Sequence, residues 1–402
     1  MPAVCFYFQV HQPFRLRGYR AGDIGKDHDY FDEGQNAAIL RKVVNKSYLP
    51  ANRKMMDLIR RHPGQFRFAF SLSGVVVEQM HAYAPEALAS FQELVATGAV
   101  EILGETYFHS LASLYEDEEF VLQVRAHSDF MQATFGVSPR VFRNTELIYD
   151  DRIAGLVKNM GFDALLAEGA DDVLAGRSPN FVYQAPNNGL KILLKNYRLS
   201  DDVAFRFSNG AWPEYPLTAD KYVNWLRRVE GAGDLVGLFM DYETFGEHQW
   251  AETGIFDFLD DLPGKLLRHK QWSFTTPSEA ITRFKSAGVL SFPRTVSWAD
   301  SERDVSAWRG NNMQQLALER LYALSDAVRR RDDPYLSDAW RRLQTSDHFY
   351  YMCTKWFADG DVHAYFSPYE SPYEAFINAM NVIEDFQIAV LGVPREPLPI
   401  AS

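Results

Sequence analysis

Short apolar runs alternate with segments of helical periodicity along most of the chain. The runs are rich in aromatic and β-branched residues, which is typical of strands, and alternation of strands with helices favours parallel βαβ units. We predict strands at 3–10, 66–71, 100–103, 140–143, 162–167, 192–196, 235–240 and 272–275, and helices at 52–61, 85–96, 118–135, 151–160, 219–229 and 278–286.

Two segments depart from this alternation. Residues 180–197 carry Asn187-Asn188-Gly189 between two apolar runs, which predicts a β-hairpin. After about residue 290 the pattern is helical without strands, at 312–331, 335–351 and 373–391. We therefore predict a barrel domain at residues 1–290 and a C-terminal helical domain at residues 291–402 that packs on the barrel.

Polar and acidic residues directly follow several of the predicted strands. His11, Glu105, Glu146, Glu168 and Asp241 all occupy such positions. In a parallel barrel the carboxyl ends of the strands converge on one face, where active sites lie. Unrelated surface acids would instead scatter over helix faces, so we expect these side chains to share one site.

Composition narrows the classes of partner and compartment. The net charge is −12 and the chain has no basic block, so it is poorly suited to binding nucleic acid or anionic membranes. Aromatic residues make up 14% of the chain, which is compatible with stacking on sugar rings. Cys5 and Cys353 are far apart in apolar surroundings, as is typical of reduced thiols. The N-terminus resembles no signal peptide and no apolar run approaches the ~20 residues of a membrane span. We expect a cytoplasmic protein without a membrane segment.

Two of the strand-end acids have the chemistry of a retaining glycoside hydrolase. That reaction uses a carboxylate nucleophile and a carboxylic acid/base about 5–5.5 Å apart across the scissile bond. Glu146 follows the short run 141–143, and Asp241 follows the most apolar run, 235–240. A carboxyl group after an apolar strand is desolvated, which raises its pKa and suits a general acid. A single strand-end aspartate would more often be a helix cap or an ion-pair partner.

Five short motifs occur in order along the chain. They are His11-Gln12-Pro13, Gly104-Glu105-Thr106-Tyr107, Thr145-Glu146, Asp241-Tyr242-Glu243-Thr244-Phe245-Gly246, and the stretch with Glu302-Arg303-Asp304, Trp308 and Gly310. Together they make the chain resemble glycoside hydrolase family 57, the α-amylase and 4-α-glucanotransferase family. The late stretches 346–352 and 366–373 are similar to the shorter α-amylase-like members.

The resemblance implies an incomplete (β/α)7 barrel followed by helices, and cleavage of α-1,4-glucosidic bonds in α-glucans or maltooligosaccharides with retention. It also implies Glu146 as the nucleophile, Asp241 as the acid/base, and neither a catalytic metal nor a cofactor. Two positions depart from the family pattern. Gln9 stands where many members carry a second histidine, and Arg143 stands where many carry tryptophan. Both bear on the sugar site beside the nucleophile.

Around the two acids we expect a set of substrate-binding residues, each with a structural alternative. His11 is either a sugar ligand or a hydrogen-bonded core histidine, and Glu105 is either a ligand or an anchor for His109 four residues on. Glu243, two residues after Asp241, is either a ligand or a structural residue. His248 is a ligand or a surface residue, Trp308 a stacking ring or a core residue, and Asp304 a ligand or a cap near Ser306. The full predicted set is Gln9, His11, Glu105, Arg143, Glu243, His248, Asp304 and Trp308.

Three alternative activities stay open at this point. A metal-dependent deacetylase needs acids with paired histidines, and the Asp-Asp pairs at 150, 171 and 201 have none adjacent. A non-catalytic glucan-binding protein would be expected to lack one of the two carboxylates. Within the family, the glycosyl group on Glu146 can pass to water or to a sugar hydroxyl. A 4-α-glucanotransferase or branching enzyme is thus the alternative to α-amylase-like hydrolysis. The sequence gives no indication of oligomeric state.

Overall fold

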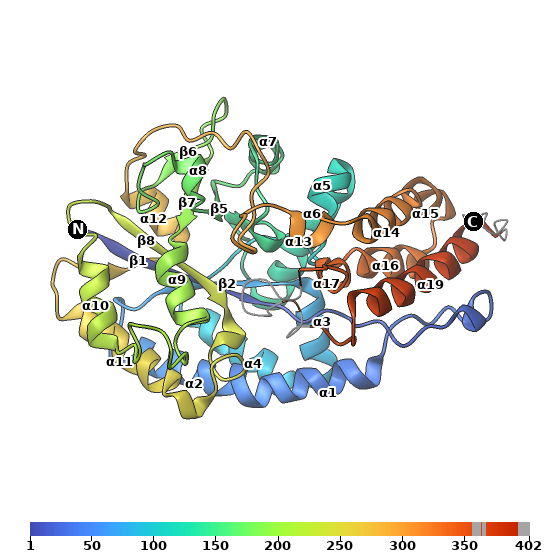
Figure 1. The fold of residues 1–402 in the computed structure, drawn as a ribbon. Coiled ribbons are helices and arrows are strands. Elements are labelled where there is room, and N and C mark those ends of the chain that lie inside the picture. The colour runs from blue at the N-terminus through green and yellow to red at the C-terminus, as the bar shows by residue number, and fades with distance from the viewer. Residues whose placement is uncertain (356–362, 364–366, 393–402) are drawn as a thin grey trace.

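A parallel β-sheet forms the centre of the molecule (Figure 1). The computed structural model describes residues 1–355, 363 and 367–392. The strands are β1 (Ala3–Val10), β2 (Phe68–Leu72), β3 (Val100–Ile102), β4 (Val141–Arg143), β5 (Ala164–Glu168), β6 (Tyr183–Gln184), β7 (Lys191–Lys195), β8 (Leu235–Asp241) and β9 (Ser273–Phe274). Seven of them follow the order β3-β2-β1-β8-β7-β5-β4, and a parallel bridge between Gly104 and Phe142 joins the two ends of this order. The predicted incomplete (β/α)7 barrel is confirmed, as is each predicted strand, with small shifts at the ends.

Helices connect the strands and cover the sheet (Figure 1). They are α1 (Glu33–Val43), α2 (Leu49–Arg61), α3 (Gly74–Tyr83), α4 (Pro85–Ala96), α5 (Ala112–Tyr115), α6 (Asp117–Phe135), α7 (Asp151–Asn159), α8 (Asp171–Leu174), α9 (Tyr197–Ala204), α10 (Ala219–Arg227), α11 (Ile255–Leu267) and α12 (Pro277–Arg283). All six predicted helices of this region are present. The predicted hairpin is also confirmed, because β6 pairs antiparallel with β7 around the Asn187–Gly189 turn.

The alternation of side chains along β1 divides the core into two layers. Ala3, Cys5 and Tyr7 point into the barrel with residues of the other strands, whereas Phe6 and Phe8 belong to the layer under the helices. Both sets are buried, as expected for a parallel strand covered on both faces. The barrel is tight enough between β7 and β8 that position 237 requires glycine. A Cβ there would lie 2.3 Å from the Leu194 carbonyl oxygen.

The C-terminal region is helical, as predicted, but two of the predicted helices are divided. Its elements are α13 (Ser306–Arg309), α14 (Asn312–Tyr322), α15 (Ser325–Arg331), α16 (Pro334–Leu343), α17 (Ser346–Tyr350) and α19 (Pro372–Leu391). One hydrophobic core contains Phe142 and Ile192 of the barrel together with Trp340 and Phe386 of these helices. Residues on both sides of the predicted boundary at 290 therefore share a core. No helix among the described residues has the length and apolar character to cross a membrane.

Candidate active site

The side chains predicted from strand ends do meet at the carboxyl edge of the barrel. His11 follows β1, Glu105 follows β3, Glu146 follows β4 and Asp241 ends β8. The register places Gln9 beside Asp241 on one neighbouring strand and beside Ser71 on the other. Parallel alignment thus brings together residues that are far apart in the sequence.

Glu146 accepts three hydrogen bonds, which fix both carboxylate oxygens. His109 Nε2 at 3.3 Å and the Ser346 hydroxyl at 3.0 Å bond to Oε1, and Trp298 Nε1 at 2.7 Å bonds to Oε2. The residue adopts a left-handed backbone conformation with φ of 55°, in the short 3₁₀ turn η3 (Thr145–Leu147). Burial opposes ionisation, but the donors, the charge of His109 and the Arg143 guanidinium hold the pKa of Glu146 below its usual value. The carboxylate is therefore ionised and oriented, as a nucleophile must be.

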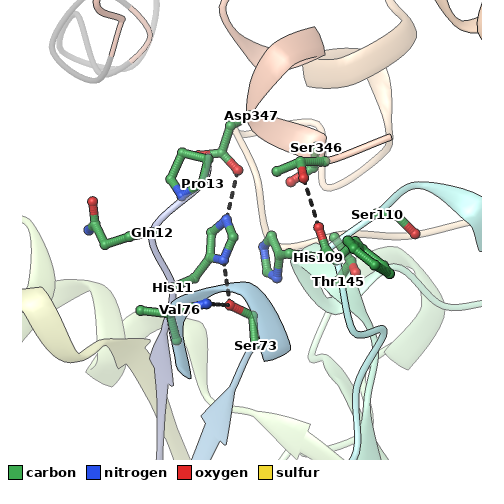
Figure 2. Close-up of polar contacts among 12 residues, drawn as sticks. His11, Gln12, Pro13, Ser73, Val76, His109, Ser110, Thr145, Ser346 and Asp347 are labelled. Atoms are coloured by element: carbon green, nitrogen blue, oxygen red, sulfur yellow. Dashed lines mark hydrogen bonds and ion pairs between the residues drawn. The ribbon is translucent and has the colours of Figure 1, made fainter. Parts of the chain in front are cut away.

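His109 joins two carboxylates and carries a positive charge. Its Nδ1 lies 3.2 Å from Glu105 Oε2, and its Nε2 bonds to Glu146. Although burial disfavours the charge, these two partners raise the pKa of His109 to about 9. The ring stacks on that of His11 with a centroid distance of 3.9 Å, as Figure 2 shows. Sequence reasoning treated His109 only as a loop anchor for Glu105. The spacing of four residues gave no sign of its contact with Glu146.

Beneath His109 lies a buried group formed by Glu105, Arg143 and Gln9. Glu105 Oε2 is 3.7 Å from the Arg143 guanidinium, and Gln9 Nε2 donates to Glu105 Oε1 at 3.5 Å. Arg143 lies over the Phe239 ring at 4.8 Å. Burial alone would raise the pKa of Glu105, but His109 and Arg143 outweigh this effect and lower the pKa. Because all three side chains are buried, their placement supports a charge network under the site and does not support the sugar contact that was predicted for them.

His11 is bound on both ring nitrogens. Nδ1 is 2.7 Å from the Ser73 hydroxyl and Nε2 is 3.0 Å from Asp347 Oδ2 (Figure 2). Ser73 also accepts the Val76 N–H at the start of α3, so its hydroxyl hydrogen is free to donate to Nδ1. This makes His11 a neutral donor to Asp347, consistent with burial and the nearby His109 charge, which lower the pKa of His11. The pKa of Asp347 is held well below its usual range by its histidine neighbours, despite burial.

Asp241 differs from Glu146 in having no strong partner. Among the described residues, no side chain forms a hydrogen bond or ion pair with its carboxyl group. Burial and the negative charge of Glu146 raise the pKa of Asp241 to about 7. The site therefore holds one carboxylate that stays ionised and one carboxyl group that can carry a proton near neutral pH. Such a pair provides an acid and a nucleophile in one site.

Comparison with known proteins fits this geometry. Residues 5–293 match the family described as glycosyl hydrolase family 57. The chain belongs to this family. It is 42% identical over 400 residues, covering 96% of this chain and 84% of the other, to a Methanocaldococcus jannaschii protein named "Putative alpha-amylase".

Two solved structures share the family 57 fold at low sequence identity. The 4-alpha-glucanotransferase from Thermococcus litoralis has a TM-score of 0.70 and 15% identity over 96% of this chain, which spans 60% of that protein. A branching enzyme from Thermococcus kodakaraensis, which belongs to family 57, has a TM-score of 0.69 and 13% identity over 98% of this chain and 92% of that one. These likenesses show a common fold.

Glu243 shares the fourth family 57 motif with Asp241, and His248 lies two residues after that motif. Glu243 is buried, accepts hydrogen bonds from the hydroxyl of Tyr48 and from Gln12, and has its pKa raised to about 8 by burial and the charge of Asp241. These contacts support the structural role considered for it. His248 is partly buried on the following loop, and burial lowers its pKa to about 4.

The two predicted ligands of the fifth family 57 motif, Asp304 and Trp308, have other partners in the structure. The Asp304 carboxylate accepts the Ser306 N–H at 2.8 Å, at the start of α13. Trp308 is 1% exposed and packs near Tyr350, so its ring has no face open to a sugar. The residue that reaches the site is Trp298, through Glu146. These contacts fit the structural alternatives considered for both residues: Asp304 bonds at the start of α13 and Trp308 lies in the core.

Trp298 is held by a buried ion group that sequence reasoning did not identify. Lys195 Nζ lies 4.9 Å from the centre of the Trp298 ring and bonds to Asp201 Oδ1 at 2.9 Å. Arg303 donates to the Trp298 carbonyl and lies 3.1 Å from Asp201 Oδ2. Glu168 completes the group, with Oε2 3.6 Å from Lys195 Nζ. The ends of β5 and β7 thus support Glu146 indirectly, through Trp298.

Proposed function

We propose that this chain is a cytoplasmic, retaining α-amylase-like enzyme that cleaves α-1,4-glucosidic bonds in α-glucans or maltooligosaccharides. The observation that carries the proposal is the contrast between the two carboxyl groups. Glu146 is ionised by three donors, and Asp241 carries a proton near pH 7. A retaining mechanism needs this division.

In the first step, Glu146 attacks the anomeric carbon of the bound sugar while Asp241 protonates the departing glycosidic oxygen. The bond between that oxygen and the anomeric carbon breaks, and a glycosyl ester forms on Glu146. In the second step, Asp241, now a carboxylate, removes a proton from water, which attacks the same carbon and releases Glu146. His109, Trp298 and Ser346 keep the nucleophile oriented throughout.

The acceptor in the second step distinguishes hydrolysis from transfer. The 42% identical relative carries an α-amylase name and supports hydrolysis, whereas the two structural neighbours are named as a glucanotransferase and a branching enzyme and represent the alternative. We favour hydrolysis because the relative is far more similar to this chain in sequence.

The test is incubation of purified protein with maltoheptaose, with and without added glucose, followed by separation of products over time. Shorter products alone support the proposal, and longer products as well identify a glucanotransferase. Glu146→Gln serves as the control and should lower turnover by at least about 10⁴-fold while leaving the fold intact. Near-native turnover by that variant would refute the assignment of the nucleophile.

A further inference from the structure

Two large aromatic side chains are exposed beside the loop that follows the acid/base. Trp250 is 60% exposed and Phe205 is 47% exposed. Trp250 lies nine residues after Asp241, at the end of the loop that begins with η4 (Tyr242–Thr244). Phe205 directly follows α9, which packs beside β8. Neither ring takes part in the chemistry described above.

The backbone around Trp250 is fixed, so the exposure of its ring is not the result of a loose loop. The Trp250 carbonyl accepts the N–H and the hydroxyl of Thr253 in η5 (Ala251–Thr253). Gly246, four residues before Trp250, packs closely on the segment that contains Lys46. A Cβ at position 246 would lie 2.0 Å from the Lys46 carbonyl oxygen. His248 N–H donates to the Glu243 carbonyl at 2.9 Å, which ties the loop to the residue two after the acid/base.

One hydrogen bond holds the two aromatic positions next to each other. Gln249 Nε2 donates to the Ala204 carbonyl at 2.8 Å, so the residue before Trp250 is joined to the residue before Phe205. Phe207 anchors the other side of this segment by packing on Phe258, with a centroid distance of 5.3 Å. The two rings are thus presented from fixed supports, one on the loop that follows Asp241 and one directly after α9.

We propose that Trp250 and Phe205 form an aromatic platform on which the glucan chain stacks beyond the sugar held between Glu146 and Asp241. This inference rests on the proposed function. The apolar faces of a glucose ring match an exposed indole or phenyl face. Lys46 lies 5.6 Å from the Trp250 ring centre and pairs with Glu247, so the indole sits among charged groups, unlike a broad apolar protein interface. The platform makes the enzyme select longer chains.

Binding measured in the Glu146→Gln background separates this platform from the catalytic residues. Calorimetric titration uses maltotriose, which fills the sites next to the carboxylates, and maltoheptaose, which extends past them. Trp250→Ala should raise the Kd for maltoheptaose about tenfold and Phe205→Ala about threefold, with the Kd for maltotriose unchanged. Tyr373→Ala is the matched control, because Tyr373 is 64% exposed on α19 and should change neither value.

Each other outcome overturns the platform in a recognisable way. If Trp250→Ala leaves both constants unchanged, the platform fails and the proposed function stands. If both constants rise equally, Trp250 supports the loop and does not hold sugar. If Glu146→Gln binds neither sugar, the proposed function fails as well. If sedimentation shows an oligomer that Trp250→Ala dissociates, a second copy of this chain occupies the rings.

Discussion

Replacing His109 by glutamine removes the positive charge that contacts Glu146, the proposed nucleophile. The bond from His109 Nε2 to Glu146 Oε1 spans 3.3 Å, and a hydrogen bond to a charged group contributes about 1.5–3 kcal/mol. Because one pH unit corresponds to about 1.4 kcal/mol, losing this support for the ionised form should move the acidic limb of the activity profile to higher pH by about one to two units. The direction follows from the sign, since a carboxylate that loses a cation binds its proton more tightly.

The assay is kcat/KM for an aryl maltooligosaccharide across the pH range, which reports ionisations of the free enzyme. His127→Gln is the control. His127 is also buried beside Glu105, but it accepts the Glu105 N–H, donates to the Leu72 carbonyl and stays neutral, since burial lowers its pKa. This variant should lose stability without moving the limb. A folded His109→Gln protein with an unchanged acidic limb would show that another group ionises Glu146.

Three further predictions concern the acid, the indole donor and the barrel wall. Activity should fall above about pH 7 as Asp241 loses its proton. With substrates that have an activated leaving group, Asp241→Asn should remove this alkaline limb of the pH profile. If the limb persists, another residue causes it. Trp298→Phe keeps an aromatic ring but removes the hydrogen-bond donor to Glu146. We expect kcat to fall by roughly 10- to 100-fold with little change in melting temperature. An unchanged kcat would contradict the role of Trp298 in orienting Glu146. Gly237→Ala should lower the free energy of unfolding by about 1–3 kcal/mol in denaturant titration, because its Cβ would meet the Leu194 carbonyl; a neutral effect would mean that the strands can separate.

The barrel and the placement of the two acids at its edge could be predicted because both depend on local patterns. Strand and helix periodicity are visible in short windows, and parallel strands bring residues at their ends to one face. Glu146 and Asp241 follow strands directly, so the strand positions alone indicated where their side chains would lie.

The supports of Glu146 could not be predicted in this way. Trp298 and Ser346 lie 152 and 200 residues after it, outside any regular strand, and no period relates them to it. The fifth family motif pointed instead to Trp308, ten residues further on, and left it open between a core residue and a sugar-stacking ring. The division of the predicted helix at 335–351 has the same origin. Thr345 bonds to the Phe108 carbonyl and pairs with Ser110, which are contacts that helical periodicity does not contain.

The backbone N–H of Ser346 donates to the His109 carbonyl while its hydroxyl donates to Glu146. A ribosome releases the barrel strands long before it reaches residue 346, so a nascent chain holds Glu146 and Asp241 while Glu146 still lacks one of its donors. Under the proposed mechanism, full turnover therefore requires residue 346 to be synthesised and docked on the barrel. A protein truncated before residue 346 should bind sugar weakly and turn over slowly, even where its barrel has folded.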